Sequence, residues 1–358
     1  MTGIINKTGA RSGIVGTTTG GVSGISSSAN ATAITIDSSG NVTLSNDLIV
    51  TKTLNLGDQT EDSPTSGDVY YESGVLKIAT NVNTGAWSSG GNLSTGRYYH
   101  GGMGSQTAAL AFGGSSAIDS TEEYDGSSWS SGGALSTGKY NVTGAGTQTA
   151  GLCFGGYRGA TGQSEVVTEE YDGSSWSSGG SLSNKRQGSG GAGTQTAGLA
   201  IAGFRTGAGD IADCEEYDGT SWSSGGSMSA GRDYLAGAGT QTSAIGFGGK
   251  TYLATTEEYD GTSWSSGGNL GTARNQLAGA GTLSAGLAMG GYTGSNSNKA
   301  ETYNGTSWSS LTDLGTARHG LGGAGTTDAP LCFGGSGGTT TTEEYAVGPI
   351  IKTVTATT

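Results

Sequence analysis

Six tryptophans recur along the chain, and each is followed ten residues later by a basic residue. The pairs are Trp87/Arg97, Trp129/Lys139, Trp176/Arg186, Trp222/Arg232, Trp264/Arg274 and Trp308/Arg318. A tyrosine stands five residues before every tryptophan except Trp87, and Tyr345 ends the series without one. The spacing of tryptophans runs from 42 residues (Trp87 to Trp129) to 47 (Trp129 to Trp176). A period of this size indicates a repeat architecture.

One repeat unit predicts four short strands. It reads KYNVTGAGTQTAGLCFGG from Lys139, then a spacer, then TEEYDGSSWSSGGSLS. Apolar stretches flank Gly-Thr-Gln-Thr, which suits a hairpin turn, and Asp-Gly opens a second turn before the tryptophan. Four strands in about 44 residues are typical of a β-propeller blade. The 72 glycines recur in phase with this unit, so they indicate crowded inner strands and turns rather than disorder.

The ends of the series predict a closed ring. The last repeat supplies Arg318 and Tyr345 but no tryptophan, whereas Trp87 precedes any tyrosine of its own. Pairing the Trp87 strand with the last three strands completes a sixth blade and removes two open sheet edges. Residues 350–355 are the alternative fourth strand. We therefore expect an all-β fold, a six-bladed propeller of four-stranded blades closed by an N-terminal strand.

Over residues 85–348, these motifs resemble kelch repeats of galactose-oxidase-like propellers. The shared features are the double glycine after the second strand, Tyr-Asp in the third, Trp in the fourth and the arginine beyond it. The chain departs from the pattern at Ala202-Gly203, at Glu301-Thr302-Tyr303-Asn304 and in its short Tyr-to-Trp spacing.

Residues 1–84 are rich in Ser, Thr, Gly and Asn, and apolar residues alternate in AITIDSSGNVTLSNDLIVTKTLNL. Such alternation predicts exposed strands that need a partner to cover one face. The start, MTGIINKTGARSGIVGTT, and the stretch GDVYYESGVLKIATNVNTGAW resemble attachment and connector regions of bacteriophage tail-fibre and related virion proteins. The resemblance implies contact with other virion proteins through residues 1–84, and a homotrimer.

Charge and cysteine content narrow the possible partners. Sixteen basic and 29 acidic residues give a net charge of −13, which disfavours nucleic acid and anionic membranes. Much of the acidity lies in a repeated Glu-Glu pair, for which we expect a periodic surface location. Cys153, Cys214 and Cys332 do not suggest a disulfide scaffold. No apolar signal-peptide core or transmembrane-length run is present.

Nothing in the sequence supports catalysis, a metal or a cofactor. Asp-Gly-Ser-Ser-Trp at Asp125 and Asp172 lacks the residue that the sialidase Asp-box places between Asp and Gly, so a capped turn is expected instead. His100 and His319 stand at different repeat offsets and are expected on the surface. No phosphate-binding loop, nucleophile elbow or dinucleotide fingerprint appears. The chain is expected not to be an enzyme.

The basic residue of each repeat has two possible roles. The six could line one mouth of the channel and bind an anion. Each repeat also carries an acidic residue at the first Glu position, which suggests ion pairs within the ring. These acidic residues are Glu122, Glu169, Glu215, Glu257, Glu301 and Glu343.

Variation between repeats gathers at two places. The spacer before Glu-Glu-Tyr ranges from seven to twelve residues, for example KTYLATT and YRGATGQSEVVT, and the residues just after each basic residue also differ. Both connections leave a four-stranded antiparallel blade on the same side, so they predict one variable face, a typical recognition surface. Unconstrained drift is the alternative. The candidate ligand-binding residues are Tyr98, Tyr99, His100, Tyr140, Tyr157, Arg158, Phe204, Arg205, Tyr234, Tyr252, Tyr292 and His319.

We therefore expect an attachment segment (1–28), a β-rich shaft or connector (29–84), a propeller (85–348) and a C-terminal strand or tail (349–358). The resemblances imply a bacteriophage virion protein, a tail fibre or appendage. It would assemble in the host cytoplasm, lie exposed on the particle and recognise a host glycan or receptor. A capsid-decorating or architectural role is the alternative, and a secreted carbohydrate-active enzyme is a third.

Overall fold

A computed structural model describes residues 85–347 in full. It also describes the backbone of β1 (Ile34–Ile36), β2 (Val42–Leu44), β3 (Val69–Glu72), β4 (Val75–Asn81) and β33 (Pro349–Thr353). The chain divides into two compact units, one of Met1–Thr80 with Ile351–Thr358 and one of Asn81–Ile350. In the first, β1 pairs with β2, and β3, β4 and β33 form a three-stranded sheet. The expected attachment segment 1–28 lies outside the described residues.

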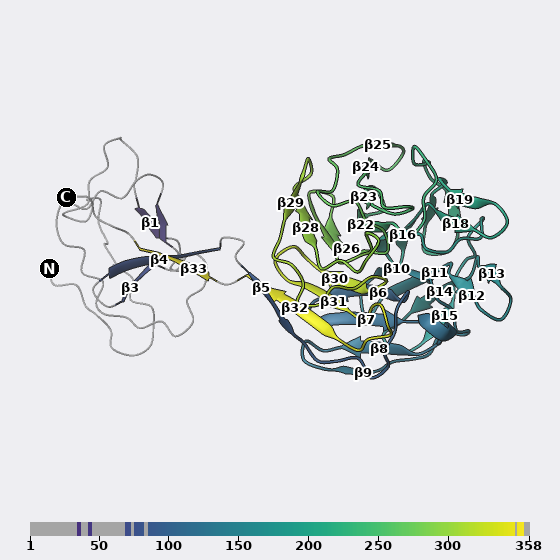
Figure 1. Cartoon of the computed structure of the whole chain (residues 1–358), viewed down its shortest axis with the longest axis horizontal. Coiled ribbons are helices and arrows are strands. Elements are labelled where there is room, and N and C mark those ends of the chain that lie inside the picture. The colour runs from purple at the N-terminus through teal and green to yellow at the C-terminus, as the bar shows by residue number, and fades with distance from the viewer. Residues whose placement is uncertain are drawn as a thin grey trace. The chain divides into compact units, whose positions relative to one another are not determined.

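The second unit is a six-bladed β-propeller, as expected (Figure 1). Each blade is an antiparallel sheet of four strands, given from the inner strand outward. Blade 1 consists of β6 (Gly101–Ser105), β7 (Ala108–Phe112), β8 (Thr121–Tyr124) and β9 (Trp129–Ser131). Blade 2 consists of β10 (Thr143–Gly146), β11 (Gly151–Phe154), β14 (Thr168–Tyr171) and β15 (Trp176–Ser178). Blade 3 consists of β16 (Gly190–Thr194), β17 (Ala197–Ile201), β20 (Glu215–Tyr217) and β21 (Trp222–Ser224). Blade 4 consists of β22 (Ala236–Thr240), β23 (Ser243–Phe247), β24 (Thr256–Tyr259) and β25 (Trp264–Ser266). Blade 5 consists of β26 (Ala278–Thr282), β27 (Ala285–Met289), β28 (Ala300–Tyr303) and β29 (Trp308–Ser310). Blade 6 consists of β30 (Gly322–Gly325), β31 (Pro330–Phe333), β32 (Thr342–Ala346) and β5 (Ala86–Ser89).

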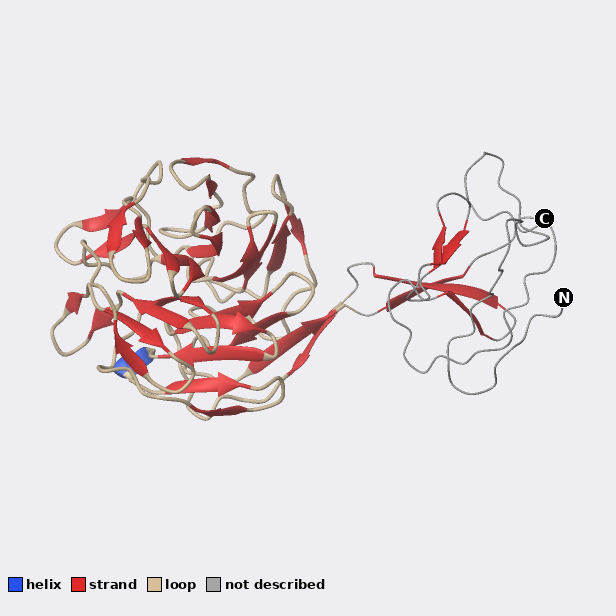
Figure 2. Ribbon diagram, turned by 180° about the vertical axis from the view of Figure 1, so that it is seen from behind, coloured by secondary structure: helices blue, strands red, loops and turns tan. Residues whose placement is uncertain are grey.

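Strands dominate the described residues, and their one helical element is the 3₁₀ turn η1 (Ser115–Ala117), as Figure 2 shows. Blade 2 carries an extra hairpin of β12 (Tyr157–Arg158) and β13 (Gln163–Ser164), and blade 3 one of β18 (Gly203–Arg205) and β19 (Gly209–Ile211). Within the described part of the chain, no helix is long and apolar enough to span a membrane.

The inner strands of the six blades contact one another in an unbroken cycle, β6, β10, β16, β22, β26, β30 and back to β6. Small residues make this approach possible. A Cβ at Gly237 would lie 2.7 Å from the carbonyl oxygen of Gly191, and one at Gly279 would lie 2.7 Å from that of Gly237. Side chains cannot fit between strands this close, which explains the glycine-rich inner strands.

The Trp87 strand closes the ring, as the unpaired ends of the repeat predict. Strand β5 pairs with β32, with Trp87 opposite Tyr345 and their rings 5.4 Å apart. The Trp87 indole also donates to the carbonyl of Thr312, at 2.8 Å. The alternative strand at residues 350–355 overlaps β33, which belongs to the sheet of β3 and β4.

The repeated tryptophans and tyrosines form the outer half of each blade. Tyr171 and Trp176 are directly opposite in the ladder, with ring centroids 4.9 Å apart, and the other blades repeat this pairing. The indole of Trp176 donates to the Thr121 hydroxyl of the preceding blade, at 2.9 Å. Each pair therefore fills the widening space between two blades and ties them together.

The second glutamate of each Glu-Glu pair links neighbouring blades. Five tyrosine hydroxyls donate to a glutamate of the preceding blade: Tyr124 to Glu344, Tyr171 to Glu123, Tyr217 to Glu170, Tyr259 to Glu216 and Tyr303 to Glu258. Burial and the nearby carboxylate raise the pKa of Tyr217 to about 12. The first glutamates are buried. The expected surface location is therefore wrong for the first glutamates, whereas the second glutamates are half-buried and contact the neighbouring blade.

The Gly-Thr-Gln-Thr turn makes a contact that the sequence did not reveal. The Gln148 amide donates to the carbonyls of Ala109 and Tyr124 in the preceding blade, at 3.0 and 2.7 Å. Gln106, Gln195 and Gln241 do the same in their blades. In these blades the turn is therefore linked to the preceding blade by side-chain hydrogen bonds.

The junction between blades 5 and 6 differs from the other five. Thr302 replaces the second glutamate, and the double glycine after the tryptophan becomes Leu311-Thr312. Leu311 is buried against Tyr345, whose hydroxyl has no hydrogen-bond partner. Thr312 instead receives the Trp87 indole and donates to the carbonyl of Gly85, at 2.8 Å. The repeat departs from its pattern where the N-terminal strand joins the ring.

This difference predicts opposite effects for one substitution at two equivalent sites. Tyr345→Phe removes an unpaired buried hydroxyl, so the free energy of unfolding in urea should stay unchanged or rise by about 1 kcal/mol. Tyr217→Phe leaves Glu170 and the Gly180 amide without their partner and should cost about 2 kcal/mol. Equal losses in the two variants would contradict this account.

Candidate ligand-binding face

The two variable sets lie on one side of the propeller, as expected. Backbone bridges join Tyr140 to Tyr157 and Gln187 to Phe204, so each residue after a basic position pairs with the spacer of its blade. We call the side formed by the second-to-third and fourth-to-first strand connections the variable-loop face. Strand β5 begins and β32 ends on the opposite side, so the variable-loop face carries neither connection to the rest of the chain.

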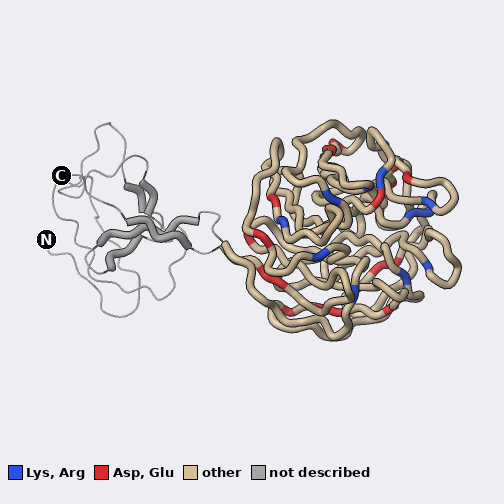
Figure 3. Tube along the Cα trace, in the orientation of Figure 1, with Lys and Arg blue, Asp and Glu red and all other residues tan. Residues whose placement is uncertain are grey.

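The basic residues form buried ion pairs beneath this face, which confirms the pairing expected from their matched numbers. The pairs are Arg97–Glu122, Lys139–Glu169, Arg186–Glu215, Arg232–Glu257, Arg274–Glu301 and Arg318–Glu343. Figure 3 shows basic positions beside acidic ones around the ring. Because both partners are buried, these cations face carboxylates rather than the solvent at the channel mouth.

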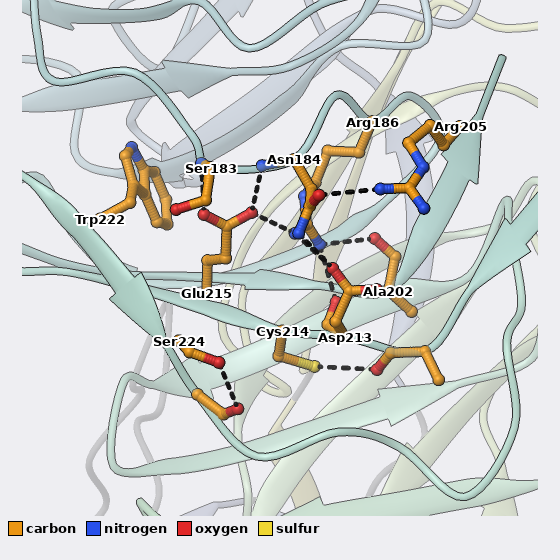
Figure 4. Close-up of polar contacts among 12 residues, drawn as sticks. Ser183, Asn184, Arg186, Ala202, Arg205, Asp213, Cys214, Glu215, Trp222 and Ser224 are labelled. Carbon is orange, nitrogen blue, oxygen red and sulfur yellow. Dashed lines mark hydrogen bonds and ion pairs between the residues drawn. The ribbon is translucent and has the colours of Figure 1, made fainter. Parts of the chain in front are cut away.

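In three blades the arginine also fixes the base of the variable loop, because Arg97, Arg186 and Arg318 each donate to carbonyls at both ends of it. In blade 3, Arg186 lies 2.5 Å from Glu215 and donates to the carbonyls of Ala202 and Asp213, both at 2.9 Å (Figure 4). These carbonyls belong to the two ends of the spacer. Glu215 in turn accepts from the Ser183 amide at 2.6 Å. The ends of the loop are therefore held while its middle is free to vary in length.

The channel mouth is closed by a belt of backbone hydrogen bonds. Its members stand two residues after each basic residue: Tyr99, Asn141, Gly188, Tyr234, Gln276 and Gly320. Each amide donates to the carbonyl of its counterpart in the preceding blade, at distances from 2.7 to 2.9 Å. All six have a positive φ, between 50° and 62°. The belt joins all the blades at one level.

Two tyrosines from opposite blades fill the opening inside this belt. The rings of Tyr99 and Tyr234 are 5.7 Å apart. The Tyr99 hydroxyl donates to Gln276 at 3.0 Å, and the Asn141 amide donates to the Tyr234 hydroxyl at 3.1 Å. Burial raises the pKa of Tyr234 to about 12, so the hydroxyl stays protonated.

Glycines make room for both rings. A Cβ at Gly320 would lie 2.9 Å from the ring of Tyr99, and one at Gly188 would lie 3.3 Å from that of Tyr234. Two hollows of about 110 Å³ each lie along the channel, one lined by the inner-strand glycines and one by the belt. The mouth is therefore sealed by side chains on the variable-loop face.

Aromatic side chains spread outward from this seal. Ring centroids are 4.8 Å apart for Tyr98 and Tyr99, 6.0 Å for Tyr99 and His319, 5.1 Å for His319 and Tyr292, and 5.9 Å for Tyr292 and Tyr252. We call this row, from Tyr98 to Tyr252, the aromatic track. Tyr252 is 37% exposed and the other four are partly exposed.

The remaining candidates also lie on this face. Tyr140 and Tyr157 form a separate pair with centroids 5.1 Å apart. Arg158 on β12 lies 3.6 Å from Glu165, and Arg205 on β18, beside Phe204, donates to Asn184 at 2.8 Å. The hairpins of blades 2 and 3 are joined, because Ser164 and Thr206 hydrogen bond at 2.9 Å. Every tyrosine of residues 85–347 outside the repeated position belongs to this face.

His100 is the exception among the candidate residues. It is 6% exposed, lies 5.5 Å from Phe333, and neither ring nitrogen has a partner. The equivalent position is apolar in four other blades, as Val142, Leu235, Leu277 and Leu321, and is Ser189 in the fifth. Burial, together with the charges of Arg97 and Arg318, holds the pKa of His100 well below its usual range. The expected surface location is wrong for His100, which occupies an apolar slot, whereas His319 is on the surface and bonds Asn296 at 2.7 Å.

The described residues offer few groups for other chemistry. The three cysteines are free and buried, and burial raises the pKa of Cys153 to about 12. Asp125 accepts from the amides of Ser127 and Ser128 at 2.8 Å, the capped turn expected there. Over residues 85–347, no group of three or more His, Cys, Asp or Glu side chains is placed to hold a metal ion.

The buried ion pairs generate a stability prediction. Glu343→Gln removes the carboxylate paired with Arg318, so the free energy of unfolding should fall by about 3 kcal/mol. Glu165→Gln, at the partly exposed pair with Arg158, should cost less than about 1 kcal/mol. Urea unfolding of both variants checks the difference, and similar losses would contradict a structural role for the buried pair.

His100 generates a prediction that depends on pH. The folded protein holds its imidazole neutral, whereas the unfolded chain takes up a proton below a pH of about 6.5. Stability is therefore lost as the pH falls through that value, by up to about 1.4 kcal/mol per pH unit. His100→Leu should raise the melting temperature more at a pH of about 5 than at about 8. A gain independent of pH would show that the imidazole is not kept neutral.

Comparison with known proteins supports the fold alone. No protein-family model matches the chain, and no curated protein matches its sequence. Among solved structures, the one described as "Structure of YjhT" matches with a TM-score of 0.59 and 14% identity, covering 73% of this chain and 99% of that chain. At this sequence identity, the match shows that the two chains share the propeller architecture, and no activity is inferred from it.

Proposed function

We propose that the chain is a bacteriophage virion protein, a tail fibre or appendage, whose kelch-type propeller recognises a host surface glycan or receptor without transforming it chemically. One observation carries the proposal: within residues 85–347, every tyrosine outside the repeated position lies on the variable-loop face, which carries neither chain connection. A domain that presents its binding side away from its tether suits an attachment protein.

The surface has the chemistry that sugar recognition needs. Partly exposed tyrosines offer apolar faces and hydroxyls, and Asn296 and Asp233 stand among them. Rigid aromatic residues lose little conformational freedom on binding. The arginine clamps and the backbone belt hold these residues in place before a ligand arrives, which lowers the entropic cost of association.

The N-terminal resemblance supplies the context. If residues 1–84 attach the propeller to other virion proteins as a trimer, each particle presents many binding faces. Weak binding at one face would then add up to firm attachment. Capsid decoration without a receptor remains the alternative, and it requires no binding by the variable-loop face.

The test combines location and adsorption. Antibodies against the propeller should label tail fibres on intact virions in electron micrographs, and the purified full chain should bind host cells. Tyr98→Ala/Tyr252→Ala should lower cell binding at least about tenfold. The control, Ser130→Ala/Ser223→Ala, changes exposed residues of the outer strands and should bind normally. Label on the head, or unchanged binding by the tyrosine variant, would overturn the receptor function.

A further inference from the structure

We infer that the ligand of the variable-loop face is a neutral polysaccharide bound along its length, at internal sugars, rather than a terminal sugar held in a pocket. This inference rests on the proposed function and specifies its substrate class. It is carried by the sealed mouth, the continuity of the aromatic track and the pairing of nearby charges.

The sealed mouth leaves no recess for the end of a chain. Tyr99 and Tyr234 fill the opening, and each hollow along the channel is only about 110 Å³. Pockets that enclose a small molecule usually hold at least about 300 Å³. A terminal sugar therefore cannot be engulfed, and contact must be made on the outer surface.

The aromatic track is longer than one sugar. Its five rings run from blade 1 through blades 6 and 5 to blade 4, with neighbouring centroids 4.8 to 6.0 Å apart. Neighbouring planes are inclined by 49° to 67°. A flat fused-ring ligand cannot stack on rings so inclined, whereas sugars linked in a chain can turn at each bond. The track therefore suits successive sugar rings.

The lysines beside the track are already paired with carboxylates, and Asp233 adds a further acidic side chain. Lys250, in the loop of Tyr252, lies 3.3 Å from Asp210, and Lys299, in the loop of Tyr292, lies 2.6 Å from Asp313. Asn296 bonds both His319 and Ser336, at 2.7 and 2.9 Å, and so places polar groups at the edge of the track. Paired cations and neutral polar groups favour hydroxyl-rich sugars over uronic or sialic acids.

Binding of the full chain to a glycan array tests this inference. The array carries neutral and acidic bacterial polysaccharides, together with neutral mono-, di-, tetra- and hexasaccharide fragments. The full chain should bind neutral polymers and the longest fragments, and it should lose up to about tenfold in affinity for each stacked sugar removed. Tyr292→Ala interrupts the track and should abolish the advantage of long fragments. The control, Ser130→Ala/Ser223→Ala, changes exposed residues of the outer strands and should keep it, and thermal melting checks that both variants fold.

The outcomes separate the two proposals. Monosaccharides that bind as tightly as hexasaccharides, acidic polymers as the only ligands, or a long-fragment advantage that survives Tyr292→Ala would overturn the internal-chain inference and leave glycan recognition standing. Adsorption to host cells without any glycan binding would point to a protein receptor and overturn it too. Absence of both would overturn the proposed function itself.

Discussion

The buried ion pair of each blade is the interaction on which the remaining architecture depends. It joins the link between two blades to the third strand of the following blade, and in three blades its arginine also holds both ends of the variable loop. Each buried charge is compensated by its partner, so removal of either one leaves the other uncompensated. The pair fixes the strand connections independently of the residues between them. A regular scaffold and an irregular face therefore follow from the same contact.

Most of the scaffold could be predicted from the sequence because each of its contacts repeats. The Trp–Tyr pairs and the Arg–Glu pairs recur at a fixed spacing. The closing strand at Trp87 is indicated by the two ends of the series, where this spacing is incomplete. Six parallel occurrences make a local pattern readable even where each short strand alone is ambiguous. The departure from the repeat at Glu301-Thr302 is explained only in three dimensions, where it lies beside the blade that the N-terminal strand completes.

The mouth of the channel could not be predicted in the same way. Its seal depends on Tyr99 packing over Gly320 and reaching Gln276, residues that are distant in sequence and differ from blade to blade. A pattern of six similar positions reveals nothing about which side chains cross the axis. The residues two positions after the basic residues form the series Tyr-Asn-Gly-Tyr-Gln-Gly. Each tyrosine is followed around the ring by a side-chain amide and a glycine, and this order is the sequence feature that indicates the seal. His100 was misplaced for a related reason, since a histidine in a variable segment gave no sign that its slot is apolar.

The belt of backbone hydrogen bonds has a consequence for how this protein can diversify. Its bonds use main-chain atoms, so the side chains at the belt can change without loosening the ring. Yet every belt residue has a left-handed backbone, which glycine and asparagine adopt readily and β-branched residues resist. The centre of the face is therefore open to a narrow set of residue types, while the clamped loops around it accept almost any length or composition. Under the proposed receptor function, adaptation to a new host surface would be expected to start at the rim and reach the axis last.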